Sequence, residues 1–208
     1  MGVVTISASY GAGGHEIGPA VAKQLGLPFL DRAIPAGVAR KLGVPMHDVE
    51  GKDEAVHSGL WRVFASMAAA PDFAGSAGAG TSIADERLLR EHTEEVLREI
   101  AAGAGGVVLG RAGAIVLADA PNALHVRLDG PAPARAAAHA RIAGIDAEAA
   151  MRDLRDNDSA RHAYVRHFYR KDATDARHYH LVIDSCALSW DVVTDLIVAA
   201  AKSRGVTA

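Results

Sequence analysis

The 208-residue sequence predicts an α/β protein with a mostly parallel, doubly wound β-sheet. Short apolar runs, rich in leucine and β-branched residues, alternate with longer stretches whose apolar residues recur every three or four positions. This alternation is typical of consecutive β-α-β units, and a glycine-rich turn separates the first strand from the first helix. The five runs expected to form strands span residues 3–8, 28–31, 106–109, 124–128 and 180–184.

Two stretches have the clearest helical spacing, residues 84–101 and residues 192–199. Ser189 is expected to cap the second helix, because a serine hydroxyl can accept a hydrogen bond from a first-turn N–H. Trp61 and Trp190 are interpreted as anchors of the core or of an interface.

The amino-acid composition favours a soluble globular protein and argues against a nucleic-acid or membrane partner. Half of the residues are hydrophobic and 23% are charged, which is typical of a soluble globular chain. The net charge of -3 gives no basic field for a nucleic-acid partner. Cys186 is the single cysteine, so no intrachain disulfide can form. Because no leader-like segment or membrane-length apolar run is seen, we expect a cytoplasmic protein without a membrane partner.

Two further segments have unusual compositions. Residues 68–82 are rich in alanine and glycine, which predicts a loop or hinge rather than a domain boundary. Residues 151–177 carry seven Lys or Arg and five Asp, so a solvated helical face is one interpretation. Four of the ten histidines, His162, His167, His178 and His180, have no zinc-motif context, and no dedicated zinc site is expected.

The sharpest local signal is the glycine loop, residues 10–15, which lies between the first predicted strand and a helix. Glycines there allow positive φ angles and let backbone N–H groups face an anion at the helix N-terminus. The alternative is a tight turn that binds nothing. We predict a nucleotide-phosphate site formed by Gly11, Ala12, Gly13, Gly14, His15 and Glu16.

The loop departs from the phosphate-loop pattern G-x-x-x-x-G-K-[ST], whose lysine contacts the outer phosphates and whose hydroxyl holds magnesium. Gly14 stands at the lysine position, and His15 and Glu16 stand where the hydroxyl belongs. His15 could donate a hydrogen bond to a phosphate from the helix N-terminus. Pro19 fits a helix only in the first turn, so the helix is expected to begin near Glu16 or to be kinked.

Six segments, in order, resemble the cytidylate kinase-like family. The first, ISASYGAGGHEI at residues 6–17, is close to the family's I-S-R-x-Y-G-S-G-G-R-E-I but lacks its two arginines. The second, LPFLDR at residues 27–32, resembles the family's G-I-P-F-Y-D-[KR]. Together the segments cover nearly the whole chain. The other four span residues 107–112, residues 119–126, residues 158–161 with 164–169, and residues 179–185, and the third of these resembles the family's lid region.

The resemblance implies a P-loop NTPase-type three-layer fold in one domain, residues 1–208, with a parallel five-stranded sheet. It further implies a helical acceptor-binding insert at about residues 33–100 and a lid at about residues 130–177. The activity would be ATP-dependent phosphoryl transfer, with ATP and magnesium as cofactors and a small-molecule nucleotide and acceptor as partners.

By position in the family pattern, Arg155 and Arg161 of the lid are candidate catalytic residues that would reach the phosphoryl group being transferred. Guanidinium groups suit phosphate oxygens because they form paired hydrogen bonds. Surface ion pairs are the alternative, for example Arg155 with Asp158. Asp31 could act in the site, orient its neighbour or cap a helix. The candidate acceptor-binding residues are Asp31, Arg32 and Arg111.

The departures from true cytidylate kinases leave the acceptor open. Arg32 replaces a serine, Gly37 replaces an arginine, and Ala112 replaces the carboxylate that would read the cytosine edge. A nucleoside monophosphate such as CMP is one possible acceptor, and its turnover is expected to be slow. Another small metabolite is a second possibility, and a nucleotide-binding regulator without catalysis is a third.

Overall fold

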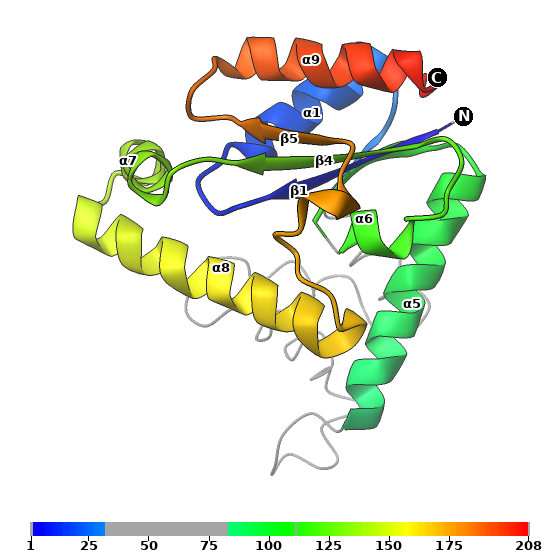
Figure 1. Ribbon diagram of the computed structural model, residues 1–208, viewed down its shortest axis with the longest axis horizontal. Helices are drawn as coiled ribbons and strands as arrows, with labels where there is room; N and C mark the ends of the chain where they lie inside the picture. The colour runs from blue at the N-terminus through cyan, green and yellow to red at the C-terminus, as the bar shows by residue number, and fades with distance from the viewer. Residues whose placement is uncertain (1, 32–82, 111, 208) are drawn as a thin grey trace.

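The computed structural model of the protein describes residues 2–31, 83–110 and 112–207. Within these ranges, five parallel strands form one sheet in the order β2-β3-β1-β4-β5 (Figure 1). The predicted parallel sheet is therefore confirmed, and the strand before the glycine loop lies at its centre. The strands are β1 (Val3–Ala8), β2 (Phe29–Leu30), β3 (Gly106–Leu109), β4 (Ala123–Asp129) and β5 (Leu181–Asp184).

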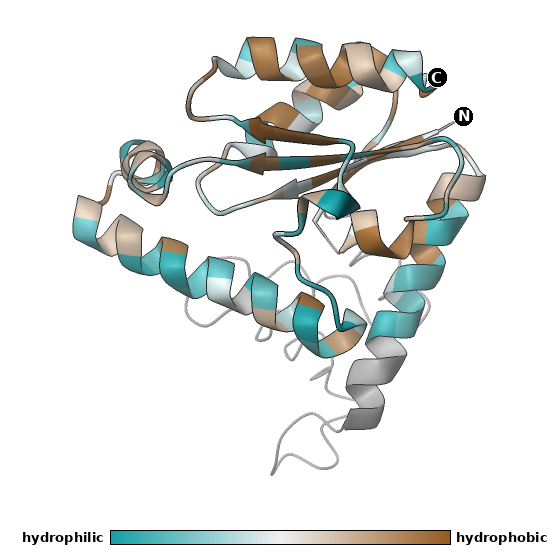
Figure 2. Ribbon diagram, in the orientation of Figure 1, coloured by the Kyte–Doolittle hydropathy of each residue, from teal (hydrophilic) through white to brown (hydrophobic). Residues whose placement is uncertain are grey.

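Helices cover both faces of the sheet, which gives three layers (Figure 1). Helices α1 (Gly14–Leu25) and α9 (Trp190–Ser203) lie on one face. Helices α5 (Ile83–Ala102) and α6 (Gly113–Val116) lie on the other, together with the C-terminal end of α8 (Ala147–Tyr169). In Figure 2 β5 is largely brown, whereas β4 alternates brown with teal. Both faces of a covered parallel sheet are mostly apolar. The two apolar layers include Ile17, Val21, Val193 and Ile197 on one side and Leu97, Val108, Leu117 and Val165 on the other.

The helices agree with the sequence pattern, with modest extensions. The helix expected over residues 84–101 is α5, and the one expected over residues 192–199 begins two residues earlier and runs to Ser203. Ser189 caps α9, since its side chain accepts a hydrogen bond from Val192 N at 3.4 Å. Asp146 caps α8 in the same way, through Ala149 N at 2.7 Å.

The start predicted for the first helix, near Glu16, is wrong. Helix α1 begins at Gly14, so Pro19 is its sixth residue and lies beyond the first turn. Its ring removes the N–H that would bond to the carbonyl four residues earlier. The helix nevertheless continues to Leu25, and its buried face, which includes Ile17 and Val21, packs on the sheet.

Helices α7 (Ala132–Ala143) and α8 follow β4 and lie at the carboxyl ends of the strands (Figure 1). They pack on one another through a small cluster that includes Ala136, Ala150 and Leu154, and Tyr10 of the glycine loop packs against the same cluster. A short 3-10 helix, η2 (Ala176–His178), connects α8 to β5. The segment predicted as a lid is therefore in contact with the predicted phosphate loop.

Several sequence predictions lie outside the described residues. The alanine- and glycine-rich segment 68–82, Trp61 and most of the predicted acceptor-binding insert belong to this group. Among the helices that the structure describes, none combines the length and apolar character needed to cross a membrane.

Candidate active site

The glycine loop joins the central strand β1 to α1 at the carboxyl edge of the sheet (Figure 1). Gly11 and Gly13 have φ angles of 79° and 75°, the left-handed conformation that the sequence predicts. Packing also requires these glycines. A Cβ on Gly11 would lie 2.5 Å from the Arg135 carbonyl oxygen, and one on Gly13 would lie 2.8 Å from Cε2 of Trp190.

The loop leaves backbone donors at the N-terminus of α1. Ala12 N donates to Ser9 O at 3.0 Å, and Glu16 N donates to Gly13 O at 3.1 Å. Within the ranges that the structure describes, the N–H groups of Gly14 and His15 have no acceptor, as is usual for the first residues of a helix. The helix dipole is positive at this end, so the loop presents a site for an anion.

Arg161 of α8 lies against the base of the loop. Its Nη1 donates to Ala8 O at 2.8 Å, and its guanidinium carbon lies 5.6 Å from the centre of the Tyr10 ring. Burial lowers the pKa of Arg161, while the charge of nearby Asp158 opposes that shift. The guanidinium stays charged, and its acceptor in the described structure is a neutral carbonyl.

Arg155, the other predicted catalytic arginine, occupies a different position. It is exposed on α8 and forms no hydrogen bond or ion pair with another described residue. The alternative pairing of Arg155 with Asp158 is also not formed, because Asp158 bonds elsewhere.

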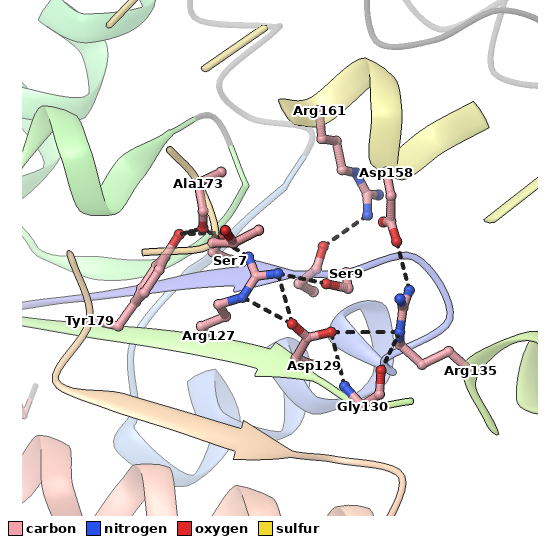
Figure 3. A network of polar contacts seen from close by, with 12 residues as sticks. Ser7, Ser9, Arg127, Asp129, Gly130, Arg135, Asp158, Arg161, Ala173 and Tyr179 are labelled. Atoms are coloured by element: carbon pink, nitrogen blue, oxygen red, sulfur yellow. Dashed lines mark hydrogen bonds and ion pairs between the residues drawn. The ribbon is translucent and has the colours of Figure 1, made fainter. Parts of the chain in front are cut away.

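Arg135 and Asp158 hold the loop from the side of α7 and α8. Arg135 Nη1 donates to Tyr10 O at 2.7 Å and to Asp158 Oδ2 at 2.8 Å. Asp158 Oδ1 accepts a hydrogen bond from Tyr10 N at 2.8 Å. Together with Arg161 they form what we call the loop clamp (Figure 3). Both polar groups of the Tyr10 backbone are thus bonded to α7 and α8.

Arg127 extends this network into the sheet. It is 5% exposed on β4, where Nη2 donates to Asp129 Oδ2 at 2.8 Å and to Ser9 Oγ at 3.0 Å (Figure 3). Nη1 donates to Ala173 O at 3.0 Å. Burial alone would raise the pKa of Asp129, but hydrogen bonds from Arg127 and from the backbone of Gly130 hold it below its usual value.

The network holds three guanidinium groups, on Arg127, Arg135 and Arg161, and the carboxylates of Asp129 and Asp158, and the charge of Asp31 also acts on Arg161. Within the described residues no carboxylate bonds directly to Arg161, whose hydrogen bond goes to the carbonyl oxygen of Ala8. A partly buried cation is costly unless an anion pairs with it, so Arg161 favours a negatively charged ligand.

His15 and Asp31 form a second polar contact at the loop. Nδ1 of His15 lies 3.2 Å from Oδ2 of Asp31, and the two side chains are 72% and 24% exposed. Asp31 follows β2, and its charge also acts on Arg161 by raising that residue's pKa. The structure thus brings together three of the predicted site residues, His15, Asp31 and Arg161. Arg32 and Arg111 lie outside the described residues.

Magnesium would need oxygen ligands near the loop. The described residues contain no group of three or more potential metal-ligating side chains. Magnesium bound with a nucleotide, however, takes most of its ligands from phosphates and water and one or two from carboxylates. Glu16 is exposed in the first turn of α1, one residue after the hydroxyl position of the phosphate-loop pattern, so its carboxylate fits that role.

Sequence reasoning missed Arg127, Asp129 and Arg135. Arg127 lies in the predicted strand 124–128. An arginine inside a buried apolar strand needs a polar partner, so its position in the sequence could have indicated a buried polar network. Arg135 lies among alanines in α7, where helical spacing gives no indication that the side chain is 7% exposed and bonded to the glycine loop.

The sequence model of the cytidylate kinase-like family matches residues 3–187. A uronate isomerase from Corynebacterium glutamicum is 28% identical over 138 residues, which cover 66% of this chain and 26% of that protein. The chain thus spans about a quarter of the length of this curated relative.

Two solved structures share the fold. An uncharacterized protein from Eubacterium ventriosum superposes with a TM-score of 0.70 at 16% identity, covering 98% of this chain and 99% of that one. A gluconokinase from Sinorhizobium meliloti superposes with a TM-score of 0.51 at 14% identity, covering 97% and 92%. At these identities the likeness concerns the fold alone.

Proposed function

Because the chain belongs to the cytidylate kinase-like family, we propose that it is an ATP-dependent phosphotransferase that acts on a small acceptor. The observation that carries this proposal is the Arg161 guanidinium, bonded to a carbonyl oxygen at the base of the loop, together with the free N–H groups of Gly14 and His15. A polyphosphate supplies the negative charge that this arrangement favours.

Phosphoryl transfer asks the protein mainly for positioning and charge stabilisation. In the proposed enzyme the N–H groups of the loop bind the donor phosphates. Arg161 stabilises charge on the phosphoryl group that moves, while Arg135 and Asp158 fix the path of the loop backbone. Magnesium, held in part by Glu16, would neutralise phosphate charge when it is bound with ATP.

The sharpest test uses two arginines of the same helix. Arg161→Gln should weaken binding of ATP with magnesium at least about tenfold, since a charge-assisted contact of roughly 1.5–3 kcal/mol is lost. Arg152→Gln is the matched control and should bind as the wild type does, because Arg152 is exposed and pairs with Glu148 on the surface of α8. Isothermal titration calorimetry measures both, and equal affinities in the two variants would contradict the proposed site.

A substitution of a loop glycine is a poor test of phosphate binding by the loop. Gly13→Val should remove ATP binding if the loop holds the phosphates. The same change would force a Cβ against Trp190 and a valine into the left-handed conformation. A loss of binding in that variant would therefore mix ligand contact with misfolding.

Two classes of phosphoryl acceptor are compatible with this proposal. The family name favours a nucleoside monophosphate such as CMP, whereas the uronate isomerase relative and the gluconokinase of similar fold favour a sugar acid. A γ-labelled ATP assay with CMP, UMP, AMP, D-gluconate and D-glucuronate separates them by which compound becomes labelled.

A regulator that binds nucleotide without turnover is the second candidate function. It is favoured by Gly14, which supplies no ammonium where a phosphate loop has its lysine. ATP binding with no labelled product from any of these acceptors would select this candidate.

A further inference from the structure

Exposed apolar side chains gather around the last helix of the chain. Five large hydrophobic residues are exposed among those that the structure describes, and four of them lie on β5, on α9 or on the turn between these elements. The four are Val182, Leu188, Val192 and Leu196, each 42–52% exposed. Single apolar residues scattered over a surface need no explanation, whereas several gathered on neighbouring elements indicate an interaction surface.

The exposed apolar residues of α9 share one side of the helix. Val192, Leu196 and Ala199 follow one another at intervals of four and three residues, so they form a single stripe, which we call the outer stripe. The opposite side of α9 packs on the sheet and on α1 through Val193 and Ile197. Figure 1 shows α9 at the outside of the molecule. Packing within the described structure therefore accounts for only one of the two apolar sides of this helix.

The charged residues of α9 lie along one flank of the outer stripe. They are Asp191, Asp195 and Lys202. Asp191 and Lys202 are eleven residues apart, which is close to three helical turns, so they lie on the same flank about 16 Å apart along the axis. Asp195 accepts a hydrogen bond from Gln24 at 3.1 Å. Within the described ranges Asp191 and Lys202 form no ion pair, so one end of the flank offers an acid and the other a base.

We propose that α9 is the contact surface of a homodimer, in which the outer stripes of two copies pack antiparallel around a two-fold axis close to Leu196. A two-fold axis joins the same surface of both copies, so that surface must be complementary to itself. With the axis between residues 196 and 197, Asp191 lies opposite Lys202 of the second copy, and this ion pair forms twice. Leu196 meets its own counterpart at the axis, and Val192 meets the small side chain of Ala199.

The order of the charges is the reason to assign this surface to a second copy. Leu196 lies five residues after Asp191 and six residues before Lys202, so the two charges are nearly equidistant from the centre of the outer stripe. A parallel pair of helices would place like charges side by side, which is unfavourable, whereas the antiparallel pair matches them. Antiparallel packing also brings opposite ends of the two helix dipoles together.

The size of the surface sets the strength expected of the dimer. A contact made mainly by one helix from each copy lies at the small end of specific protein interfaces. We therefore expect a dissociation constant on the order of 10 μM. The dimer does not depend on the proposed phosphotransferase function, because it needs no nucleotide.

Sedimentation velocity over about 1–100 μM protein tests the dimer. The wild type should change from a species of 21.6 kDa to one of twice that mass as its concentration rises. Leu196→Glu places two carboxylates against each other at the axis and should raise the dissociation constant at least about tenfold. Ile142→Glu is the matched control, because Ile142 is 61% exposed on α7, and this variant should sediment as the wild type does.

A charge swap tests the antiparallel arrangement. Asp191→Lys and Lys202→Asp each place like charges opposite one another, so each should weaken the dimer about tenfold. The double variant restores both ion pairs with their signs exchanged and should dimerise more tightly than either single variant. A general loss of helix stability cannot produce this recovery, because the double variant carries both substitutions.

Four outcomes would overturn the proposal. A wild type that stays monomeric up to about 100 μM would assign the outer stripe to a different protein. A dimer of unchanged strength in Leu196→Glu would place the contact on another surface. Assemblies that grow beyond two copies would indicate a head-to-tail contact. A double charge variant as weak as the single variants would exclude the antiparallel pair.

Discussion

At the scale of single residues, the buried polar side chains were the hardest to predict. The loop glycines, Arg161 and Asp31 could be found from local patterns and from the family resemblance. Arg127 could not be given a role, because its partners Ser9 and Ala173 are distant in sequence and become neighbours only when the sheet forms. Local periodicity holds no information on such pairings, which arise from the topology of the strands.

His125 gives a prediction at this scale. It is 4% exposed on β4, its Nδ1 lies 2.8 Å from Thr5 Oγ1, and its ring stacks on His180 at 5.0 Å. Burial, and secondarily the charge of His180, lowers the pKa of His125 to about 4. The unfolded chain binds this proton near pH 6.5, so the free energy of unfolding should fall as pH decreases from about 6.5 to 4.

The loss attributable to His125 is about 3 kcal/mol, at roughly 1.4 kcal/mol per unit of pKa. Urea unfolding at pH 7.5, 6, 5 and 4 measures it. His125→Asn keeps an acceptor close to the position of Nδ1 but does not titrate, so its unfolding free energy should fall less over the same range. If the unfolding free energies of the wild type and of His125→Asn fell equally with pH, His125 would not be the group responsible.

At the scale of elements, the strands and helices could be predicted from the sequence, but the contacts between them could not. The five strands and the helices α5 and α9 follow from apolar periodicity, because each buries one continuous face. The charged stretch 151–177 was interpreted as a solvated face. On α8, however, Asp158 and Arg161 turn toward the glycine loop while Arg155 faces solvent. Charge composition cannot distinguish the loop-facing side of α8 from its solvent-facing side, because the difference arises only from contact with the glycine loop.

The loop clamp gives a prediction at this scale. Asp158→Asn keeps the shape of the side chain but removes the charge that pairs with Arg135, and its NH2 group would face a donor. The free energy of unfolding should fall by roughly 2 kcal/mol, as is usual when a charged hydrogen bond is broken. Amide hydrogen exchange at Tyr10 should become faster, because its acceptor is weakened.

Asp156→Asn is the control for the loop clamp. It lies on the same helix two residues earlier and is exposed, so its stability and its exchange at Tyr10 should match the wild type. Equal behaviour of the two variants would mean that α8 does not hold the loop.

At the scale of the whole molecule, the described site lies where parallel α/β sheets commonly bind ligands, at the carboxyl ends of the strands. β1 supplies the loop, β2 leads to Asp31, and β4 leads to Asp129. The fold class predicted this edge from sequence alone. The acceptor side could not be predicted, because the residues that would read a base or a sugar differ from the family pattern at Arg32 and Ala112.

Ligand binding should be visible in the stability of the whole chain. A ligand of the native state adds about 2.7 kcal/mol at a hundred times its Kd. ATP with magnesium should therefore raise the Tm of the wild type clearly, and that of Arg161→Gln much less at the same concentration. A thermal-shift screen of nucleotides, phosphorylated metabolites and sugar acids checks this, and no shift with any triphosphate would contradict it.

The contact between Gly13 and Trp190 has a practical consequence. The indole of the first residue of α9 lies so close to the loop backbone that a methyl group on Gly13 would not fit between them. A phosphate that moves the loop must therefore change the surroundings of this ring. In a Trp61→Phe protein, Trp190 is the only tryptophan, and its fluorescence would report on the loop in real time. The chain carries its own optical probe at the place where binding is expected to begin.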